Sequence, residues 1–369
     1  MKTAKENFKN IIVVLNTDNA IAISGMDKDP QIKAILQVGG LGWNGAEALG
    51  EVLVGDINPS GRLAYTYAQN SLSAPATQDL GHVNFSNADE IKAWMVEQTG
   101  VDQFAQTYVM QKESIYVGYR YYETRYEDYV LGVNNASSIS GMDTETVDRY
   151  DTAQGKRVTP SEWTYGDQMG YTFGYGLSYS QFKQEFVGEP SYDNDGRYIF
   201  TVRVTNNGPK AGKDVVQIWA QTPYTQTDKD RKVEKSAIQL AAFEKTGEAG
   251  HMGEKEETVL LQPGDHEDVK VTVDLRDIAS WDSLANDGKG GYVLSEGTHY
   301  FALGNGAHDA LNNVLAAKGL SAEQKARMDA SGDASKVWSF DQRNRDEETY
   351  SVSEYTGETI ENQLQDLDI

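Results

Sequence analysis

The chain has 369 residues, enough for two or three domains of ~100–200 residues each. Its formal net charge of -23 disfavours binding to nucleic-acid phosphates or to an anionic membrane surface, whereas a neutral ligand such as a sugar meets no such repulsion. The sequence contains no cysteine, which excludes disulfides, thiolate nucleophiles and cysteine metal sites.

The amino-terminal segment shows no apolar stretch followed by a small-residue cleavage site, so no signal peptide is visible. No run approaches the ~20 apolar residues that a membrane helix needs. We therefore expect a soluble chain that has neither nucleic acid nor membrane as a partner. Its localisation stays open between the cytoplasm and an exported bacterial protein, because a lack of cysteine is compatible with both.

The first 70 residues carry the pattern of an α/β fold. Residues 11–15 form an unbroken β-branched run, typical of parallel strands covered on both faces. A second run at residues 34–38 precedes a helix-forming stretch at 46–53, and a third short strand is predicted at 62–67. Parallel strands belong in a sheet with several neighbours, yet little sequence precedes the first one. We therefore expect that the opening strands of this domain are missing.

A G-x-G-x-x-G pattern at residues 40–45 lies between the second predicted strand and the helix. A dinucleotide site would need an acidic ribose partner ~20 residues further on, and Asp56 comes too early. A tight turn is therefore favoured over a nicotinamide dehydrogenase. The turn-rich residues 55–63 are interpreted as a rigid elbow, with the alternative that Arg62 pairs with a carboxylate on a neighbouring domain.

Residues 70–112 and 124–170 are polar, tyrosine-rich and weakly periodic, and we interpret both as long insertions. Within the first, residues 87–98 predict a helix, because Asn87 is a suitable N-cap and the apolar side chains that follow share one face.

An aromatic segment at residues 114–123 places four tyrosines around one arginine. Aromatic rings stack on the apolar face of a pyranose, and arginine binds hydroxyls or orients carboxylates. Candidates for a substrate rim or an interdomain contact are therefore Tyr119, Arg120, Tyr121 and Trp43. The alternative is a structural strand whose tyrosines cover a domain interface, and a second aromatic stretch at 171–179 is interpreted as a hinge.

The hydrophobic period changes to two from about Phe186 onward. Apolar and polar residues alternate at 198–204 and at 269–275, with turn-forming residues between the runs. Four further strands are predicted at residues 214–221, 238–244, 258–261 and 292–303. This spacing predicts an antiparallel sandwich of immunoglobulin or fibronectin type, followed by a helix-prone stretch and an acidic tail that we interpret as linker.

Signatures of other chemistries are lacking in the sequence. The five histidines are scattered and form no metal-binding pair, and no G-x-S-x-G elbow marks a serine hydrolase. Acidic residues are too abundant for one catalytic pair to stand out. We therefore predict no cofactor and no metal.

Taken in order, eight segments resemble glycoside hydrolase family 3, especially its β-glucosidase-like members. They are residues 12–17, 55–63, 115–122, 173–179, 204–208, 211–217, 243–245 and 303–308. The long insertions and the residues near 307–313 resemble the domain-permuted branch, in which the catalytic barrel follows the fibronectin type III-like domain.

The resemblance implies a fold class that combines a partial α/β/α sandwich with a fibronectin type III-like β-sandwich. Residues 1–183 would form the partial α/β domain, 184–306 the fibronectin type III-like domain, and 307–369 a helical and acidic linker tail. The implied function is the non-barrel portion of a retaining β-glucosidase-like hydrolase. Its expected partners are a β-linked oligosaccharide or glucoside substrate and a missing (β/α)8 barrel.

The resemblance also implies a retaining mechanism, in which an Asp of the barrel attacks and a Glu of the α/β domain protonates the leaving group, ~5–5.5 Å apart. The family's Ser-Asp-Trp motif is not found, since residues 280–282 have the order Ser-Trp-Asp, and the usual Glu would fall before Met1. We assign no catalytic residue and expect the chain alone to be inactive. The alternative function is a non-catalytic carbohydrate-binding or cell-surface interaction module.

Overall fold

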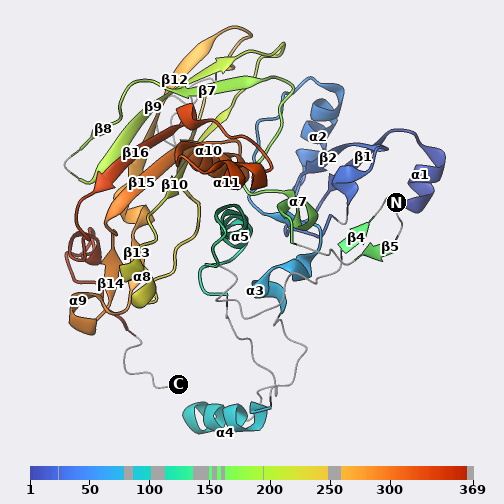
Figure 1. The fold of residues 1–369 in the computed structure, drawn as a ribbon. Coiled ribbons are helices and arrows are strands. Elements are labelled where there is room, and N and C mark those ends of the chain that lie inside the picture. The colour runs from blue at the N-terminus through green and yellow to red at the C-terminus, as the bar shows by residue number, and fades with distance from the viewer. Residues whose placement is uncertain are drawn as a thin grey trace.

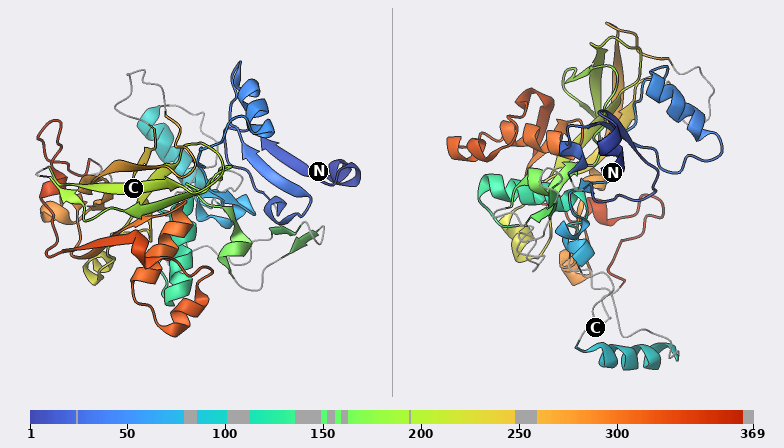
Figure 2. Two further views of the ribbon diagram at one scale, coloured as in Figure 1. Left: turned by 90° about the horizontal axis from the view of Figure 1, so that it is seen from above. Right: turned by 90° about the vertical axis from the view of Figure 1, so that its right-hand side faces the viewer.

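The computed structural model describes residues 1–23, 25–78, 86–100, 113–135, 149–151, 156–158, 163–193, 195–247 and 259–363. An α/β layer lies beside an antiparallel β-sandwich, and helices cover one face of the sandwich (Figure 1). Seen from above in Figure 2, the amino-terminal lobe projects from one end of the sandwich. These layers confirm the predicted fold class. Parts of both predicted insertions and the last residues of the acidic tail lie outside the described residues.

The α/β layer contains the parallel strands β1 (Ile11–Leu15) and β2 (Ile32–Gln37), preceded by helix α1 (Lys2–Asn7) and followed by helix α2 (Gly45–Val54). The first two predicted strands and the helix are thus confirmed, with small shifts of their ends. Helix α2 stops at Gly55, whose φ of 85° is a left-handed conformation that glycine adopts without strain.

The predicted third strand at residues 62–67 is wrong. Only β3 (Tyr67–Ala68) forms there, and it pairs with β6 (Met169–Tyr171) rather than with the parallel sheet. The reason lies in Leu63, whose N–H donates to the carbonyl of Tyr175 and whose carbonyl accepts from Gly174. Because the aromatic hinge satisfies this backbone, it is not available to a sheet neighbour.

The sandwich consists of two antiparallel sheets. The first contains β12 (His266–Asp274), β9 (Arg197–Asn206) and β7 (Phe182–Phe186), with β8 (Ser191–Tyr192) also paired to β9. The second contains β11 (Gln239–Lys245), β10 (Val215–Gln221), β15 (Gly297–Leu303) and β16 (Val337–Gln342). The alternating runs at 198–204 and 269–275 pair directly as β9 and β12, as the period of two predicts.

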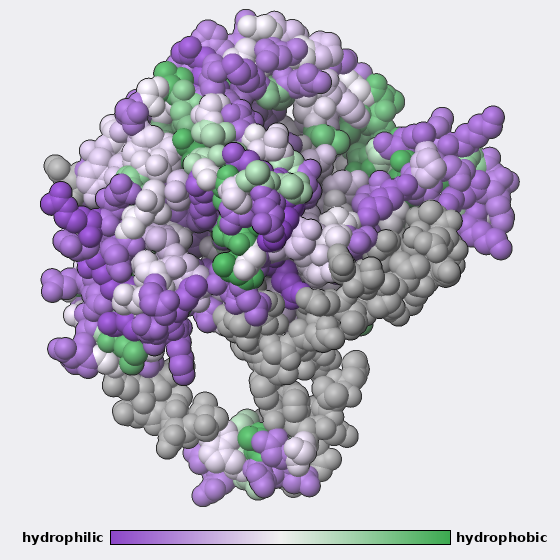
Figure 3. Space-filling view, in the orientation of Figure 1, coloured by the Kyte–Doolittle hydropathy of each residue, from purple (hydrophilic) through white to green (hydrophobic). Residues whose placement is uncertain are grey.

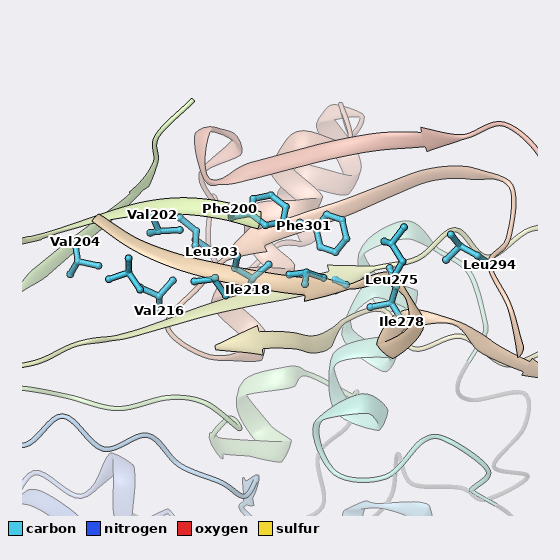
Figure 4. Close-up of a cluster of buried hydrophobic side chains, with 14 of the residues drawn as sticks. Phe200, Val202, Val204, Val216, Ile218, Leu275, Ile278, Leu294, Phe301 and Leu303 are labelled. Atoms are coloured by element: carbon cyan, nitrogen blue, oxygen red, sulfur yellow. The ribbon is translucent and has the colours of Figure 1, made fainter. Parts of the chain in front are cut away.

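Apolar side chains from the two facing sheets form the main core (Figure 4). Phe200 and Val202 of β9 meet Ile218 of β10 and Phe301 of β15, and all four are at most 1% exposed. Side chains on alternate positions of β10 and β15 point the other way. Among them is Trp219, fully buried beneath helix α10 (Ala307–Ala317) in a second core. The second sheet is therefore covered on both faces.

The interpretation of residues 307–369 as a linker tail is contradicted. Helix α10 is buried against the sandwich, and β16 is an edge strand that pairs with β15 along its whole length. Arg345 is also fixed, because its Nη1 lies 2.7 Å from Asp228 and its Nη2 lies 2.6 Å from Asp282. Pairing with strands more than 30 residues away in sequence, which local patterning does not reveal, holds this region in place.

The strand considered for residues 114–123 is also wrong, because helix α5 (Tyr119–Leu131) starts within it and continues into the predicted insertion 124–170. The helix predicted at residues 87–98 is confirmed, because helix α4 spans Ala88–Thr99. The predicted strand 292–303 is interrupted at residues 294–296 and forms β14 (Gly291–Val293) and β15, which begins at Gly297. Of 258–261, residue 258 is not described, and Leu261 makes only an isolated bridge.

Short elements complete the described chain. They are α3 (Pro75–Gln78), β4 (Arg149–Asp151), β5 (Lys156–Val158), α7 (Tyr165–Gln168), α8 (Gln226–Asp230), β13 (Ser280–Asp282), α9 (Ala285–Gly288) and α11 (Ala322–Arg327), with 3-10 turns at Met26–Lys28, Ser71–Ser73, Leu275–Ile278, Ala334–Lys336 and Thr349–Ser351. Within the described residues, every helix is too short or too polar to cross a bilayer.

Candidate functional site

Helix α5 buries polar and charged side chains along most of its length. Four of its five charged residues, Glu123, Arg125, Glu127 and Asp128, are between 0% and 7% exposed. A charge that leaves water without a partner costs several kcal/mol, so each of these side chains needs a specific contact. The contacts of this helix therefore define the first candidate site.

Glu123 has donors on both of its oxygens. Its Oε1 accepts from the hydroxyls of Tyr165 at 2.6 Å and Thr172 at 3.0 Å, and its Oε2 lies 2.8 Å from Nδ1 of His308. The side chain is fully buried. Glu123 therefore holds the segment of Tyr165 and Thr172 against helix α10, and it has no path to a substrate in solvent.

His308 lies between two carboxylates. Its Nε2 is 2.9 Å from Asp329, and its ring stacks on Tyr165 with the centroids 3.7 Å apart. Burial alone would lower the pKa of His308, but Glu123 and Asp329 outweigh burial and raise that pKa to about 10. Burial likewise acts to raise the pKa of Asp329, yet the hydrogen bond and charge of His308 hold it below its usual value. Both ring nitrogens of His308 therefore donate.

Tyr126 adds a neutral connection to the same cluster. Its hydroxyl lies 2.8 Å from Oδ1 of Asn312 and 2.9 Å from Oδ1 of Asp329, and it accepts the backbone N–H of Asp329. Burial raises the pKa of Tyr126 well above that of a free tyrosine. We refer to Glu123, Tyr126, Tyr165, His308 and Asp329 as the α5 network. It joins helix α5, the segment around α7, and helix α10 into one unit.

The carboxyl-terminal half of α5 is fixed by further pairs. Glu127 accepts from Lys318 at 2.7 Å and from the side-chain amide of Gln221 at 3.0 Å. The guanidinium of Arg125 lies over the ring of Trp163, 5.4 Å from its centroid. These contacts attach the helix to strand β10 of the sandwich and to Trp163, which lies within the second predicted insertion.

A groove of about 360 Å³, here named the junction groove, opens where the α/β layer meets the sandwich. Its lining includes Arg62, Ser178, Asp214, Asn305, Asp309 and Lys336. Nη2 of Arg62 lies 2.5 Å from Asp214, and both side chains are largely buried. Gln184 also donates to Asp214, at 2.7 Å. The alternative in which Arg62 pairs with a carboxylate of the neighbouring sandwich is thereby confirmed.

The elbow at residues 55–63 is held from both sides. Oδ1 of Asn58 accepts from the hydroxyl of Ser178 and from the backbone N–H of Tyr179, both at 2.7 Å. Nδ2 of Asn58 donates to the carbonyl of Ala211 in the sandwich, at 3.2 Å. The elbow is therefore a fixed connection between the α/β layer, the aromatic hinge and the sandwich.

The four candidates named from the sequence lie in different environments. Tyr121 is fully buried, so its ring has no free face for a sugar, and this position does not fit a substrate rim. Tyr119 stacks on Phe173 with centroids 5.0 Å apart, and its hydroxyl accepts the N–H of Leu240. Arg120 is partly exposed, and Trp43, before helix α2, is fully exposed. Tyr119 is partly exposed like Arg120, so these two residues and Trp43 keep surface for a ligand or a neighbouring domain.

The α5 network was not predicted from the sequence. One signal was available, because Glu123 and Glu127 recur at helical spacing among tyrosines, and His308 sits in the first turn of an alanine-rich helix. Their contact joins residues 185 positions apart, which no local pattern reveals.

Comparison with known proteins extends across both layers. A family model described as the glycosyl hydrolase family 3 C-terminal domain matches residues 1–179. Beta-glucosidase A of Butyrivibrio fibrisolvens is 29% identical over 322 residues, which cover 84% of this chain and 30% of that protein. The beta-glucosidase of Ruminococcus albus is 27% identical over 312 residues, which cover 84% of this chain and 24% of that protein.

A solved structure gives the same picture. The beta-glucosidase of Paenibacillus barengoltzii matches with a TM-score of 0.55 and 26% identity, over 83% of this chain and 25% of that chain. This chain thus spans less than a third of the length of each of these three proteins. Because each of these matches covers at least 83% of this chain, each extends over parts of both the α/β layer and the sandwich.

Proposed function

The chain belongs to glycoside hydrolase family 3, and from this membership we propose that it is the non-barrel portion of a retaining β-glucosidase-like hydrolase that removes terminal β-linked glucosyl residues. The observation that carries the proposal is the continuous similarity to proteins named beta-glucosidase over 84% of this chain. In this proposal both catalytic carboxylates come from segments other than these 369 residues, including a (β/α)8 barrel.

Exposed apolar side chains of the α/β layer support a docked neighbour. On β1, Ile12 is 51% exposed and Val14 is 39% exposed, although runs of this kind are normally covered on both faces. On helix α2, Leu53 and Val54 are also exposed, and Figure 3 shows hydrophobic surface over this helix. We propose that this surface receives the further strands and the barrel of the complete enzyme, with the exposed Trp43 near the contact.

The division into domains follows from the same proposal. We place the boundary between the α/β part and the fibronectin type III-like part near residue 183, at the start of β7 (Phe182–Phe186). Because β16 belongs to the second sheet, the sandwich unit extends at least through Gln342. The α5 network and the Arg62–Asp214 pair then act as positioning elements that hold the α/β part at a fixed orientation to the sandwich.

Hydrolysis measurements test this proposal directly. The purified chain is expected to release no aryl group from an aryl β-glucoside, because no acid pair of its own is proposed to reach the substrate. A chimera is then made by replacing the corresponding segment of the Butyrivibrio fibrisolvens enzyme with this chain, and it is expected to hydrolyse the same substrate.

Two controls make the result specific. The chimera carrying Arg62→Ala should be less active, because the junction loses its ion pair, whereas the chimera carrying Arg203→Ala should be unchanged, because Arg203 makes an exposed ion pair on the sandwich surface. Robust hydrolysis by the purified chain alone would contradict the proposal.

A further inference from the structure

A second groove, of about 490 Å³, is lined by residues of β8, β9, β12 and β16. The β8 end of the sandwich lies away from the α/β layer (Figures 1 and 2). We name this second groove the distal groove. It is formed by the β8–β9 hairpin, the end of β12, the end of β16 and the turn at Thr349–Ser351. Its lining includes Tyr192, Tyr198, Asp274, Arg276, Asp341 and Tyr350. None of these residues takes part in the junction groove or the α5 network.

One wall of the distal groove is aromatic. Tyr192 is 58% exposed, and its ring centroid lies 4.8 Å from that of Tyr198. Tyr198 in turn contacts Trp338 and Phe340, with centroids 4.9 Å and 5.2 Å away. The exposed ring of Tyr192 therefore rests on an aromatic cluster continuous with the sandwich core, which limits its motion and leaves ring surface for a ligand.

The other wall of the groove is polar, and hydrogen bonds within the protein fix the orientation of its side chains. Asp274 accepts the backbone N–H of Arg276 at 2.8 Å, and Asp341 accepts the hydroxyl of Thr298 at 2.6 Å. The guanidinium of Arg276 lies 5.9 Å from the ring centroid of Tyr350 and donates to the carbonyl of Val352. A carboxylate accepts up to about four hydrogen bonds, so both acids retain acceptor capacity for ligand hydroxyls.

The chemistry of these walls selects one class of ligand. Carboxylates in the lining and the net charge of -23 disfavour phosphates and other anions. Among the described residues, no three His, Asp or Glu side chains are arranged to hold a metal ion. A sugar ring offers an apolar face to Tyr192 and hydroxyl donors to Asp274 and Asp341. The groove volume also falls within the ~300–1,000 Å³ of typical ligand sites.

We propose that the distal groove binds a neutral oligosaccharide without hydrolysing it, and so forms a second sugar site on the sandwich. The site would hold a polysaccharide or a long substrate at a distance from the α/β layer, on which the barrel is proposed to dock. The groove and its ligand class follow from its own residues. Only the preference for a β-linked glucan rests on the proposed function.

Calorimetric titration of the full chain with tetrasaccharides of β-1,4-linked, β-1,3-linked and α-1,4-linked glucose tests this proposal. We expect saturable binding of at least one β-linked sugar. Tyr192→Ala should weaken it about tenfold, and Asp341→Asn should weaken it severalfold without changing the thermal unfolding temperature. The matched control is Tyr355→Ala, which removes a tyrosine that is 91% exposed and outside the groove lining, and it should bind as the unaltered chain does.

Each outcome of the titration either supports or overturns a sugar site in the distal groove. Equal affinity of the Tyr192→Ala variant and the unaltered chain, or no heat with any of the three sugars, would overturn the distal sugar site. Tight binding of calcium that Asp341→Asn abolishes, with no response to sugars, would assign the groove to a cation instead. Binding of the α-linked sugar alone would keep the site and remove only the glucan preference. The titration requires no hydrolysis, so an inactive chimera would leave its result unchanged.

Discussion

The sandwich and the α/β layer use the same apolar residue types with opposite results. Val202 of β9 and Ile218 of β10 are fully buried between two sheets. In contrast, the side chains of Ile12 and Val14 on β1 are 51% and 39% exposed. Both regions have high strand propensity, so propensity does not explain the difference. Burial follows from what covers each face of a sheet: the two sandwich sheets cover each other, whereas one face of β1 has no layer over it among the described residues. The sandwich core therefore supplies most of the stability of the described chain. The α/β layer depends for its stability on contacts with the sandwich, such as the Arg62–Asp214 pair.

The comparison predicts the largest loss of stability in the sandwich core. Phe301→Ala removes a fully buried ring between the sheets and should lower the free energy of unfolding by about 3–5 kcal/mol. Urea unfolding followed by tryptophan fluorescence, to which the buried Trp219 contributes, measures this change. If the free energy of unfolding fell by less than about 1 kcal/mol, as is typical of surface positions, the sandwich core would not be the main source of stability.

A smaller loss is expected at the boundary between the regions. Glu123→Gln leaves the charge of His308 paired only with Asp329 and should cost about 2–3 kcal/mol, less than the ~3–5 kcal/mol for complete loss of a partner. The control is Glu323→Gln, which removes an exposed partner of Arg327 and should cost less than about 1 kcal/mol. Equal losses in both variants would show that burial of Glu123 does not matter.

The same boundary should depend on pH through His308. Its folded pKa of about 10 lies above the ~6.5 of an unfolded histidine, so its contribution is complete below pH ~6.5 and is lost as pH rises through 10. Between pH 6.5 and 8 the contribution should fall by about 2 kcal/mol, at about 1.4 kcal/mol per pH unit. The measurement is the difference in unfolding free energy between the unaltered chain and His308→Asn at several pH values.

That difference is needed because Lys235 acts in the opposite direction. Burial lowers the pKa of Lys235 to about 8, so its contribution to stability grows as pH rises above 8. Subtracting the His308→Asn curve removes this contribution, which both proteins share. A difference that stays constant from pH 6 to pH 10 would contradict the charged state of His308.

The smallest effect is expected on the exposed face of the α/β layer. Ile12→Ser should change the unfolding free energy of the isolated chain by less than about 0.5 kcal/mol, because the side chain is 51% exposed. In the active chimera the same change should lower stability or activity, because the position would then be covered. Equal, small effects in both settings would show that no neighbour docks on β1.

Sequence patterning succeeded where contacts are periodic and local. The alternation at residues 198–204 and 269–275 identifies β9 and β12, and the β-branched run at 11–15 identifies β1. It failed for helix α5, whose tyrosines favour strands when taken alone but are held as a helix by Glu123 and its distant partners. The candidate site was missed for the same reason, since its geometry comes from tertiary contacts rather than from spacing.

Strand β16 has a consequence for synthesis on the ribosome. Strand β15 is complete at Leu303, but its outer edge pairs only with β16, whose last residue is Gln342. Until those residues emerge, the nascent chain presents an open sheet edge with Phe301 beside it, still without Trp338. Unpaired edges are templates for aggregation. A pause in translation between these two strands should therefore lower the yield of folded protein more than a pause of equal length after Gln342.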